Sequence, residues 1–213
     1  MRNMSDKKIF FIGLNKTGTT SLHHLLDASG VSSVHWKIPA RPVFLGKTIY
    51  RNFSAGLPLL HGMDQFVGYS EFTFTNNEIH LDGTRLFRQL HAEYPTSYFI
   101  LNTRDKDRWI ASRANHFSDT YGMYIDRFKK CLNLPEEAVK DLWAAHYDEH
   151  LANVREFFSD KPNFLEFDIE TDPPENIASL VAADFNIDPG KWSKRNTGKS
   201  LTKRREKKSF DQK

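Results

Sequence analysis

The residues with the clearest chemical potential lie in one short stretch, Gly13 to Leu22 (GLNKTGTTSL). This stretch follows an apolar run that ends in glycine, and it leads into a segment whose leucines recur with helical spacing. A glycine-bounded loop that enters a helix directs backbone N–H groups and the positive helix end at one point, where they favour an anion. Lysine and hydroxyl side chains add further donors. The pattern predicts a phosphate-binding loop made of Asn15, Lys16, Thr17, Gly18, Thr19, Thr20 and Ser21.

The loop departs from the Walker A pattern of nucleotide-binding proteins, G-x-x-x-x-G-K-[ST]. Thr19 stands where that pattern has its lysine, and Lys16 lies inside the loop instead. A nucleoside triphosphatase uses the later lysine and a Ser/Thr–Mg²⁺ contact to hold its phosphates. The missing lysine argues against a P-loop kinase or NTPase. This class is kept as the alternative because the strand–loop–helix start fits it and Phe167-Asp168 is a candidate Walker B strand end. A plain connecting turn is the remaining interpretation.

Arg104 is a second candidate for binding an anion, because of its place after a predicted strand. Arg104 follows the apolar run Ser97–Thr103, and Ser112 comes eight residues later in a predicted helix. Parallel α/β sheets bind ligands at the carboxyl ends of their strands, and a planar guanidinium suits phosphate oxygens. The pair alone is weak, because such a spacing arises easily by chance. The alternatives are an ion pair of Arg104 with Asp105 or Asp107 and simple helix packing for Ser112.

Taken together, these motifs resemble those of sulfotransferases that use 3′-phosphoadenosine 5′-phosphosulfate (PAPS). Residues 16–20 (KTGTT) are similar to the family's 5′-phosphosulfate loop, and Arg104 with Ser112 to its 3′-phosphate site. The resemblance implies that the loop binds the 5′-phosphosulfate and that Lys16 stabilises the leaving oxygen. It implies no metal, because lysine, arginine and backbone donors neutralise the cofactor.

The resemblance covers most of residues 8–198 and is closer to the carbohydrate and bacterial branches than to the cytosolic aryl branch. It includes the stretches Phe87–Ser112 and Phe164–Asn196. The C-terminal R-K-G-x-x-G segment of cytosolic members has no match. Residues 191–199 are the basic, glycine-containing candidate at that place, with Lys194, Arg195 or Lys199 as the residues that would cap the 3′-phosphate.

Sulfuryl transfer also calls for a base that takes the acceptor's proton. The resemblance places this base, a histidine or glutamate, between the two cofactor motifs. Glu71 ranks first, because it follows a short strand-like piece where related sequences often carry an acid. His61 is the next candidate, since a histidine is suited to work near neutral pH. Asp64 and His80 lie in the same segment.

A third pattern, His146-Tyr147-Asp148-Glu149-His150, matches the H-x-x-E-H motif of inverted zinc peptidases. Histidines at i and i+4 share one face of a helix, which suits zinc. A catalytic zinc site needs a third protein ligand, and nothing downstream singles one out. The favoured interpretation is a structural helix whose buried stripe includes Trp143, Tyr147 and Leu151.

The elements that must position these residues alternate between strand and helix. Apolar runs predict strands over Lys8–Gly13, Val31–Trp36, Ser97–Thr103 and Phe164–Ile169. Helical spacing predicts helices over Thr19–Ala28, Thr84–Tyr94, Asp107–Phe117, Pro135–Phe158 and Pro174–Phe185. Lys37–Asp64 is predicted to be irregular with at most one helix. The alternation predicts an α/β fold: a single domain with a central parallel sheet, helices on both faces, and a P-loop NTPase-like arrangement.

Composition sets the outer limits. The 213 residues, 39% of them hydrophobic and 17 of them Phe, suffice for one domain with a sizeable core. No apolar run approaches the roughly 20 residues of a membrane-spanning helix. A single cysteine, Cys131, excludes an intrachain disulfide and a cysteine-rich zinc site. We therefore expect a soluble, cytoplasmic protein of undetermined oligomeric state.

The basic charge is concentrated at the C-terminus. The net charge is +3, and residues 199–213 hold seven Lys or Arg against two acidic residues, which is +5 and leaves −2 for residues 1–198. We expect an α/β domain over 1–198 and a basic, flexible tail over 199–213. This distribution argues against a nucleic-acid partner.

The acceptor is not specified by the motifs. The aromatic- and histidine-rich stretch Trp36–Phe74 is predicted to form a pocket for a small molecule, a carbohydrate or a lipid headgroup. A non-catalytic module that binds an adenosine bisphosphate or a protein partner is the remaining alternative.

Overall fold

Five parallel strands form the centre of the protein. The computed structural model describes residues 7–39 and 41–194. Its main sheet has the order β2-β3-β1-β6-β9, and every neighbouring pair of strands is parallel. The strands are β1 (Ile9–Phe11), β2 (Ser33–His35), β3 (Gly68–Ser70), β6 (Tyr98–Thr103) and β9 (Phe164–Asp168). The predicted α/β fold with a central parallel sheet is confirmed.

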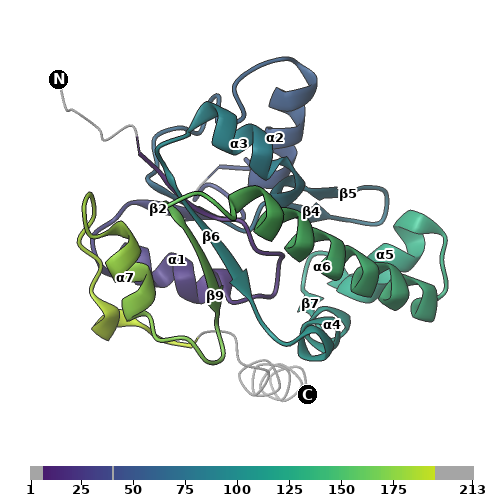
Figure 1. The fold of residues 1–213 in the computed structure, drawn as a ribbon. Helices are drawn as coiled ribbons and strands as arrows, with labels where there is room; N and C mark the ends of the chain where they lie inside the picture. The colour runs from purple at the N-terminus through teal and green to yellow at the C-terminus, as the bar shows by residue number, and fades with distance from the viewer. Residues whose placement is uncertain (1–6, 40, 195–213) are drawn as a thin grey trace, which may run out of the picture.

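Helices cover both faces of this sheet (Figure 1). Side chains alternate along a strand, so Phe10 enters one hydrophobic cluster while Ile9 and Phe11 enter the other. The Phe11 side packs against α1 (Thr19–Ala28) and α7 (Glu175–Val181). The Phe10 side packs against α2 (Leu45–Ser54), α3 (Phe87–Glu93) and α6 (Glu136–Phe158). A strand buried on both faces explains the continuous apolar runs of the sequence.

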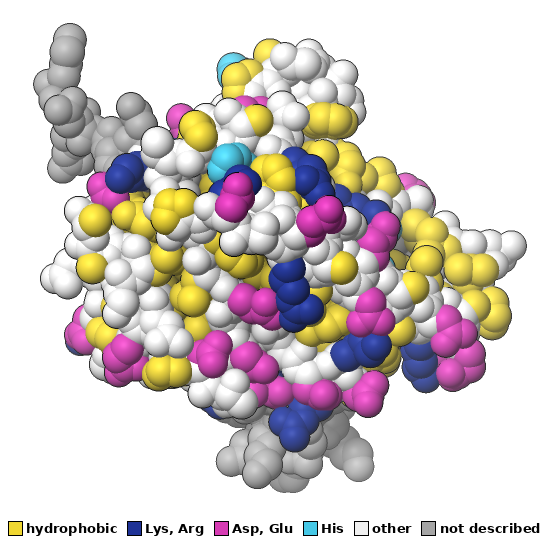
Figure 2. Space-filling model, in the orientation of Figure 1, with side chains coloured by type: hydrophobic (Ala, Val, Ile, Leu, Met, Phe, Trp, Pro, Cys, Tyr) yellow, Lys and Arg dark blue, Asp and Glu magenta, His cyan; other side chains and the backbone are white. Residues whose placement is uncertain are grey.

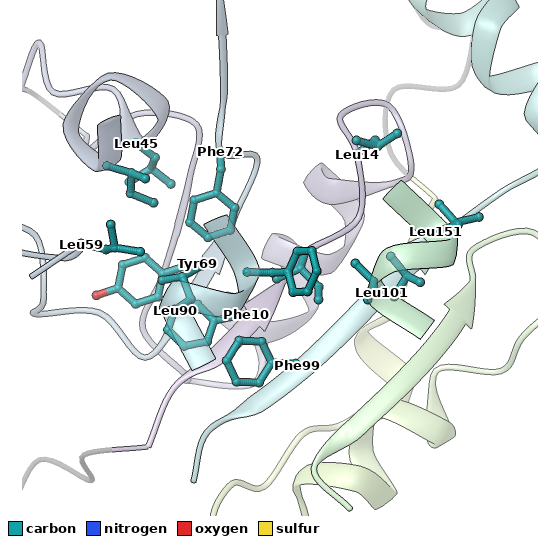
Figure 3. Packing of buried hydrophobic residues seen from close by; sticks show 14 of the residues in the cluster. Phe10, Leu14, Leu45, Leu59, Tyr69, Phe72, Leu90, Phe99, Leu101 and Leu151 are labelled. Carbon is teal, nitrogen blue, oxygen red and sulfur yellow. The ribbon is translucent and has the colours of Figure 1, made fainter. Parts of the chain in front are cut away.

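Aromatic rings tie the three central strands together on the Phe10 side (Figure 3). The Phe10 ring of β1 lies between Tyr69 of β3 and Phe99 of β6, with ring centroids 5.6 and 5.1 Å apart. Leu90 of α3 belongs to the same hydrophobic cluster (Figure 3). Burial of each such side chain contributes roughly 1.5–3 kcal/mol to stability, so this cluster fixes the strands that carry the loop.

The predicted helices are present with somewhat different ends. The helix over Thr19–Ala28 has the predicted bounds. The helix predicted over Thr84–Tyr94 begins as a 3₁₀ turn, η1 (Gly83–Leu86), before α3, and α7 ends at Val181 instead of Phe185. The helix after Arg104, α4 (Lys106–Ala114), ends before the predicted Phe117. Asp105 caps α4 by accepting a hydrogen bond from the Arg108 N–H, so the helix begins just after the strand end.

Several short elements were not predicted. They are the helix α5 (Tyr124–Leu132), the hairpin β4 (Thr73–Thr75)–β5 (His80–Asp82), the hairpin β7 (Phe117–Ser118)–β8 (Gly122–Met123) and a 3₁₀ turn η2 (Pro189–Lys191). The strand β3 corresponds to the short strand-like piece before Glu71, whose place in the central sheet was not predicted. Strands of two or three residues are too short to show a periodic pattern. They nevertheless matter, because most of them surround the site described below.

No helix among the described residues is long and apolar enough to cross a membrane. On the face shown in Figure 2, acidic and basic side chains are interspersed. The predicted tail, 199–213, lies outside the described residues, as does Arg195.

Candidate active site

The loop between β1 and α1 has a backbone that few residues adopt. Gly13 is required at its start, because a Cβ there would lie 1.9 Å from the Asn102 carbonyl oxygen of β6. Gly18, at φ 80°, begins helix α1 from the left-handed region. Lys16 also has a positive φ, 70°, which costs a non-glycine residue free energy. Such strain in a loop is typical of a functional site.

Three side chains from the β6–α4 segment hold the loop in place. The backbone carbonyls of residues 15, 16 and 17 accept hydrogen bonds from Trp109 Nε1 (2.8 Å), Arg104 Nη1 (3.2 Å) and Asn102 Nδ2 (3.1 Å), respectively. In a trans peptide the C=O and the following N–H point in opposite directions. With these carbonyls held toward β6 and α4, the N–H groups of residues 16–18 face the other way. The loop is thus preorganised as a set of donors.

The loop borders a cavity of about 820 Å³. The cavity brings together most of the predicted site residues: Asn15, Lys16, Gly18, Thr19, Thr20, Ser21, Glu71, Arg104, Ser112 and Lys194. Thr17 is the exception within the loop. Its side chain is buried behind the loop, where the hydroxyl donates to the Leu14 carbonyl and accepts from Asn102 Nδ2. Thr17 therefore shapes the loop through these bonds.

Glu71 reaches the loop because β3 lies beside β1 in the sheet. It follows β3 directly, with a φ of 63°, and its carboxylate accepts a 2.9 Å hydrogen bond from the Thr19 hydroxyl. Burial raises the pKa of Glu71 to about 7, although the Thr19 hydrogen bond and the charge of Lys16 oppose the shift. A carboxyl group with this pKa can exchange a proton near neutral pH.

Lys16 extends toward a histidine that sequence reasoning missed. Its Nζ lies 3.3 Å from His116 Nδ1. Burial lowers the pKa of His116 to about 3, so the ring is neutral and accepts from the ammonium. Burial also lowers the pKa of Lys16, an effect that Glu71 opposes. A lone histidine just after a helix carries no sequence signal, so only the fold reveals this contact.

His35 at the end of β2 completes a chain of polar contacts. Its Nε2 lies 3.1 Å from Thr19 Oγ1 and 3.5 Å from Thr20 Oγ1. Because the Thr19 hydroxyl donates to Glu71, it accepts from the ring N–H of His35. Burial lowers the pKa of His35 to about 3 and keeps the ring neutral. His35 thereby orients the hydroxyl that holds Glu71.

Two further clusters line the cavity beside the loop. The Glu170 cluster comprises Arg104, Arg108, Ser112, Glu170 and Lys194. Glu170 binds Arg104 Nη2 at 2.9 Å, and Arg108 Nη1 lies 3.4 Å from the same carboxylate oxygen. Lys194 Nζ lies 3.4 Å from the Glu170 carbonyl oxygen. Arg104 Nε is buried and has no hydrogen-bond partner among the described residues, so the guanidinium retains a free donor.

The Arg127 cluster is built from residues that are scattered along the chain. It comprises Trp36, Phe74, Thr75, Tyr121, Tyr124 and Arg127. Its members come from the loop after β2, from β4, from the β7–β8 turn and from α5. Phe74 and Tyr121 meet edge to face, with ring centroids 6.2 Å apart. None of these six residues was singled out as a site residue by the sequence motifs.

The other candidate bases lie elsewhere. The prediction of His61 is corrected: its side chain is exposed and does not line the cavity, and its carbonyl accepts from Asn52. Asp64 pairs with Lys8 at 3.0 Å, before the start of β1, which is the opposite end of the strand from the loop. His80 is held by the Thr75 hydroxyl at 2.8 Å and does not line the cavity. Of the four candidates, Glu71 is the one that the fold brings to the loop.

Comparison with known proteins identifies the family. Residues 8–173 match the family model described as a sulfotransferase domain. The chain belongs to the sulfotransferase domain family. A solved sulfotransferase from Alicyclobacillus acidocaldarius is similar at 18% sequence identity and a TM-score of 0.48, with 92% of this chain and 90% of that chain covered. No curated protein gives a significant match.

In this sulfotransferase domain the zinc motif has a structural position. His146 and His150 lie on the buried face of α6. His150 Nε2 is 2.8 Å from the Ile12 carbonyl oxygen, and His146 Nε2 is 3.8 Å from Asp82 Oδ2. Within the described ranges, no three His, Cys, Asp or Glu side chains are grouped to hold a metal ion. The helix face instead supports the first strand of the sulfotransferase sheet.

The Walker B candidate of the kinase alternative is also displaced from the site. Asp168 ends β9, which is separated from β1 by β6. Its carboxylate accepts the Glu170 N–H at 2.8 Å, and it does not line the cavity. The strands that flank β1 are β3 and β6, and they are followed by Glu71 and Arg104. The acidic residue that the fold brings to the loop is therefore Glu71, and Asp168 of the kinase alternative lies one strand further away.

Proposed function

We propose that this sulfotransferase moves a sulfuryl group from PAPS to a hydroxyl or amine of a small-molecule, carbohydrate or lipid-headgroup acceptor. One observation carries the proposal: Glu71 and Lys16 line one cavity at the same loop, where the Glu71 carboxylate accepts a hydrogen bond from Thr19. A base and a cation beside a set of backbone donors are the groups that in-line transfer of an anionic group needs.

The residues present fit PAPS. The loop offers N–H donors at the start of α1, and Gly13 and Gly18 keep the backbone free of Cβ atoms where neighbouring chain approaches closely. Arg104 supplies a buried donor without a partner, Nε, for a second anion. We assign the 5′-phosphosulfate to the loop and the 3′-phosphate to Arg104 and Ser112, with Lys194 beside them. Arg195, the other predicted capping residue, lies outside the described residues.

When bound, PAPS supplies an activated sulfuryl group with a phosphate as its leaving group. Lys16 Nζ lies next to the loop, where an ammonium donates to an oxygen that gains negative charge. Neutral His116 accepts from the same ammonium and so holds it in position without adding a competing positive charge. The loop N–H groups need no rearrangement, because Asn102, Arg104 and Trp109 already fix their orientation.

Glu71 is assigned the role of base. Its carboxylate is held by Thr19 at the loop, so it faces the same space as Lys16. With a pKa of about 7, it is ionised above neutral pH and able to accept the proton of an acceptor hydroxyl. The lowered pKa of Lys16 sets the alkaline limit, because the neutral amine no longer stabilises the leaving oxygen. We expect a bell-shaped pH dependence whose acid limb reports Glu71 and whose alkaline limb reports Lys16.

The test follows transfer of label from [³⁵S]PAPS to a mixed panel of phenols, sugars and amino alcohols. The wild-type protein should label at least one class, and Lys16→Met should lower the rate about 10²–10³-fold, as for loss of one transition-state donor. Lys130→Met, an exposed lysine on α5, is the matched control and should retain the rate. Equal rates for Lys16→Met and wild type would overturn the proposal.

A further inference from the structure

Arg127 is the feature of the cavity that the proposed function leaves unexplained. This arginine of α5 lines the cavity, yet it is only 5% exposed. Its Nη1 donates to the Thr75 carbonyl at 3.1 Å, while Nε and Nη2 are buried without a hydrogen-bond partner among the described residues. A buried cation with unmade hydrogen bonds costs folding free energy, because it has lost water without full replacement. Two N–H donors of Arg127 are therefore available to a ligand that enters the cavity.

A second arginine beside it is in the same condition. Arg113 is 1% exposed, and its guanidinium lies 4.5 Å from the ring centroids of both Trp109 and Trp143. Its Nε and Nη1 also have no hydrogen-bond partner in the described part of the chain. The Tyr124 ring lies between the two arginines, 4.6 Å from the Arg127 guanidinium and 5.2 Å from that of Arg113. Two buried positive charges therefore lie close together, Arg127 at the cavity and Arg113 on the other side of the Tyr124 ring, and aromatic rings are their main neighbours.

This positive charge lies in the same cavity as the residues that we assign to the transfer. Arg127, Lys16, Glu71 and His116 all line the cavity, and Thr75, which holds Arg127, is on β4, close in sequence to Glu71. The charge of Arg127 also contributes to lowering the pKa of both Lys16 and His116. Arg104 and Glu170 form a separate pair that belongs to the 3′-phosphate site assigned above. Arg127 is thus free to serve the second substrate.

We propose that the acceptor is an anion: a hydroxyl compound that also carries a carboxylate, phosphate or sulfate, and that this charged group binds Arg127. This inference rests on the proposed function and specifies its acceptor. An anionic acceptor must approach an anionic donor, and their repulsion weakens binding unless a cation offsets it. Arg127 supplies that cation, and its planar fork suits two oxygens of the anion.

The remaining residues of the Arg127 cluster fit the body of such a molecule. The rings of Trp36, Phe74 and Tyr121 line the cavity and offer apolar surface to a sugar or aromatic ring. Tyr121 lies over the Arg127 guanidinium from the β7–β8 turn, 5.7 Å from its ring centroid. We expect this side chain to move aside when the anion binds, which exposes the free nitrogens of Arg127. The acceptor hydroxyl then lies toward Glu71, which takes its proton as the new oxygen–sulfur bond forms and the sulfur–phosphate oxygen bond breaks.

The test measures binding of matched acid and neutral compounds to the protein saturated with 3′-phosphoadenosine 5′-phosphate (PAP). The pairs are 4-hydroxybenzoate and its methyl ester, glucuronate and glucose, and glycerol 3-phosphate and glycerol. Isothermal titration measures the dissociation constant of each compound. In the wild type, at least one acid should bind 10-fold or more tightly than its neutral partner, as for a hydrogen bond to a charged group. The pair that shows this preference distinguishes a carboxylate from a phosphate.

Arg127→Gln should reduce that preference to within about 2-fold, while Arg51→Gln, an exposed arginine on α2, should leave it unchanged. Arg127→Lys keeps the charge without the fork and should lie between them, which covers the case in which the glutamine variant does not fold. Equal binding of acids and neutral partners to the wild type, binding of none of the six, or an unchanged preference in Arg127→Gln or Arg127→Lys would overturn the inference. PAP binding would persist in those cases, whereas failure of the proposed function would remove PAP binding as well.

Discussion

The Glu170 cluster and the Arg127 cluster line the same cavity but are built in opposite ways. In the Glu170 cluster, Arg104 and Arg108 share one carboxylate at 2.9 and 3.4 Å. In the Arg127 cluster, the arginine has one backbone acceptor and two aromatic neighbours. In the first cluster the arginines share a carboxylate, whereas the arginine of the second has no carboxylate partner among the described residues.

This difference matches the two substrates that we assign. The donor carries the same phosphates in every turnover, so its site can be built from a fixed loop and paired side chains. The acceptor site must recognise one compound among many, and an uncompensated buried charge discriminates strongly because it binds poorly to any neutral molecule. We place the meeting point of the two substrates at Glu71. Its carboxylate contacts the loop, and its backbone leads, two residues later, into β4 of the Arg127 cluster.

The largest expected effect is at this meeting point. Glu71→Gln should lower kcat about 10²–10⁴-fold, the usual contribution of a general base. Below a pH of about 7 the wild-type carboxyl is protonated and cannot accept a proton, so wild-type kcat should fall as pH drops through 7. The variant should lose this acid limb, which a pH series of initial rates checks. Glu78→Gln, at an exposed position in the β4–β5 turn, should behave like wild type.

PAP affinity should not fall in Glu71→Gln, because the glutamine oxygen can still accept the Thr19 hydrogen bond and the loop loses no donor. If the variant keeps most of its kcat and the acid limb of its pH profile, a residue other than Glu71 takes the acceptor's proton.

A smaller effect is expected within the Glu170 cluster. The Glu170 carboxylate competes with an incoming phosphate for Arg104 and adds negative charge beside it. Glu170→Gln should therefore tighten PAP binding about 3-fold, within the range of a partly exposed ion pair. Isothermal titration measures this change, and the effect should shrink at high salt. Weaker PAP binding in the variant would mean that Glu170 positions Arg104 for the phosphate and does not compete with it.

How far the sequence predicts each cluster follows from how it is built. The loop is one contiguous segment, and Arg104 with Ser112 lies on one strand–helix unit, so local pattern is sufficient to find them. Lys194 was found from its place in the chain. Glu71 could be ranked first because it follows an apolar piece, although the strand β3 itself has only three residues.

Trp36 and Phe74 belong to the stretch that we expected to form a pocket for the acceptor, and both line the cavity. The rest of the Arg127 cluster could not be predicted, because its members meet only through tertiary structure. Trp36 follows β2 and Arg127 lies in α5, which the sequence analysis did not assign as a helix. His116 and Asn102 are similar cases. Each is a single polar residue whose role depends on a contact with the loop, 100 positions away in the chain for His116 and 85 for Asn102. His61 shows the converse error, since its residue type suits the chemistry but the fold leaves it at the surface.

The central claim is that the cavity binds an adenosine 3′,5′-bisphosphate through the loop and Arg104. Thermal unfolding with PAP, and separately with ATP–Mg²⁺ and GTP–Mg²⁺, tests it most directly. A ligand at 100 times its Kd adds about 2.7 kcal/mol, which for a protein of this size raises Tm by roughly 5–11 °C. We predict this shift with PAP in the absence of metal, and its near loss in Arg104→Ala. No shift with PAP, together with a metal-dependent shift with ATP or GTP, would contradict the account.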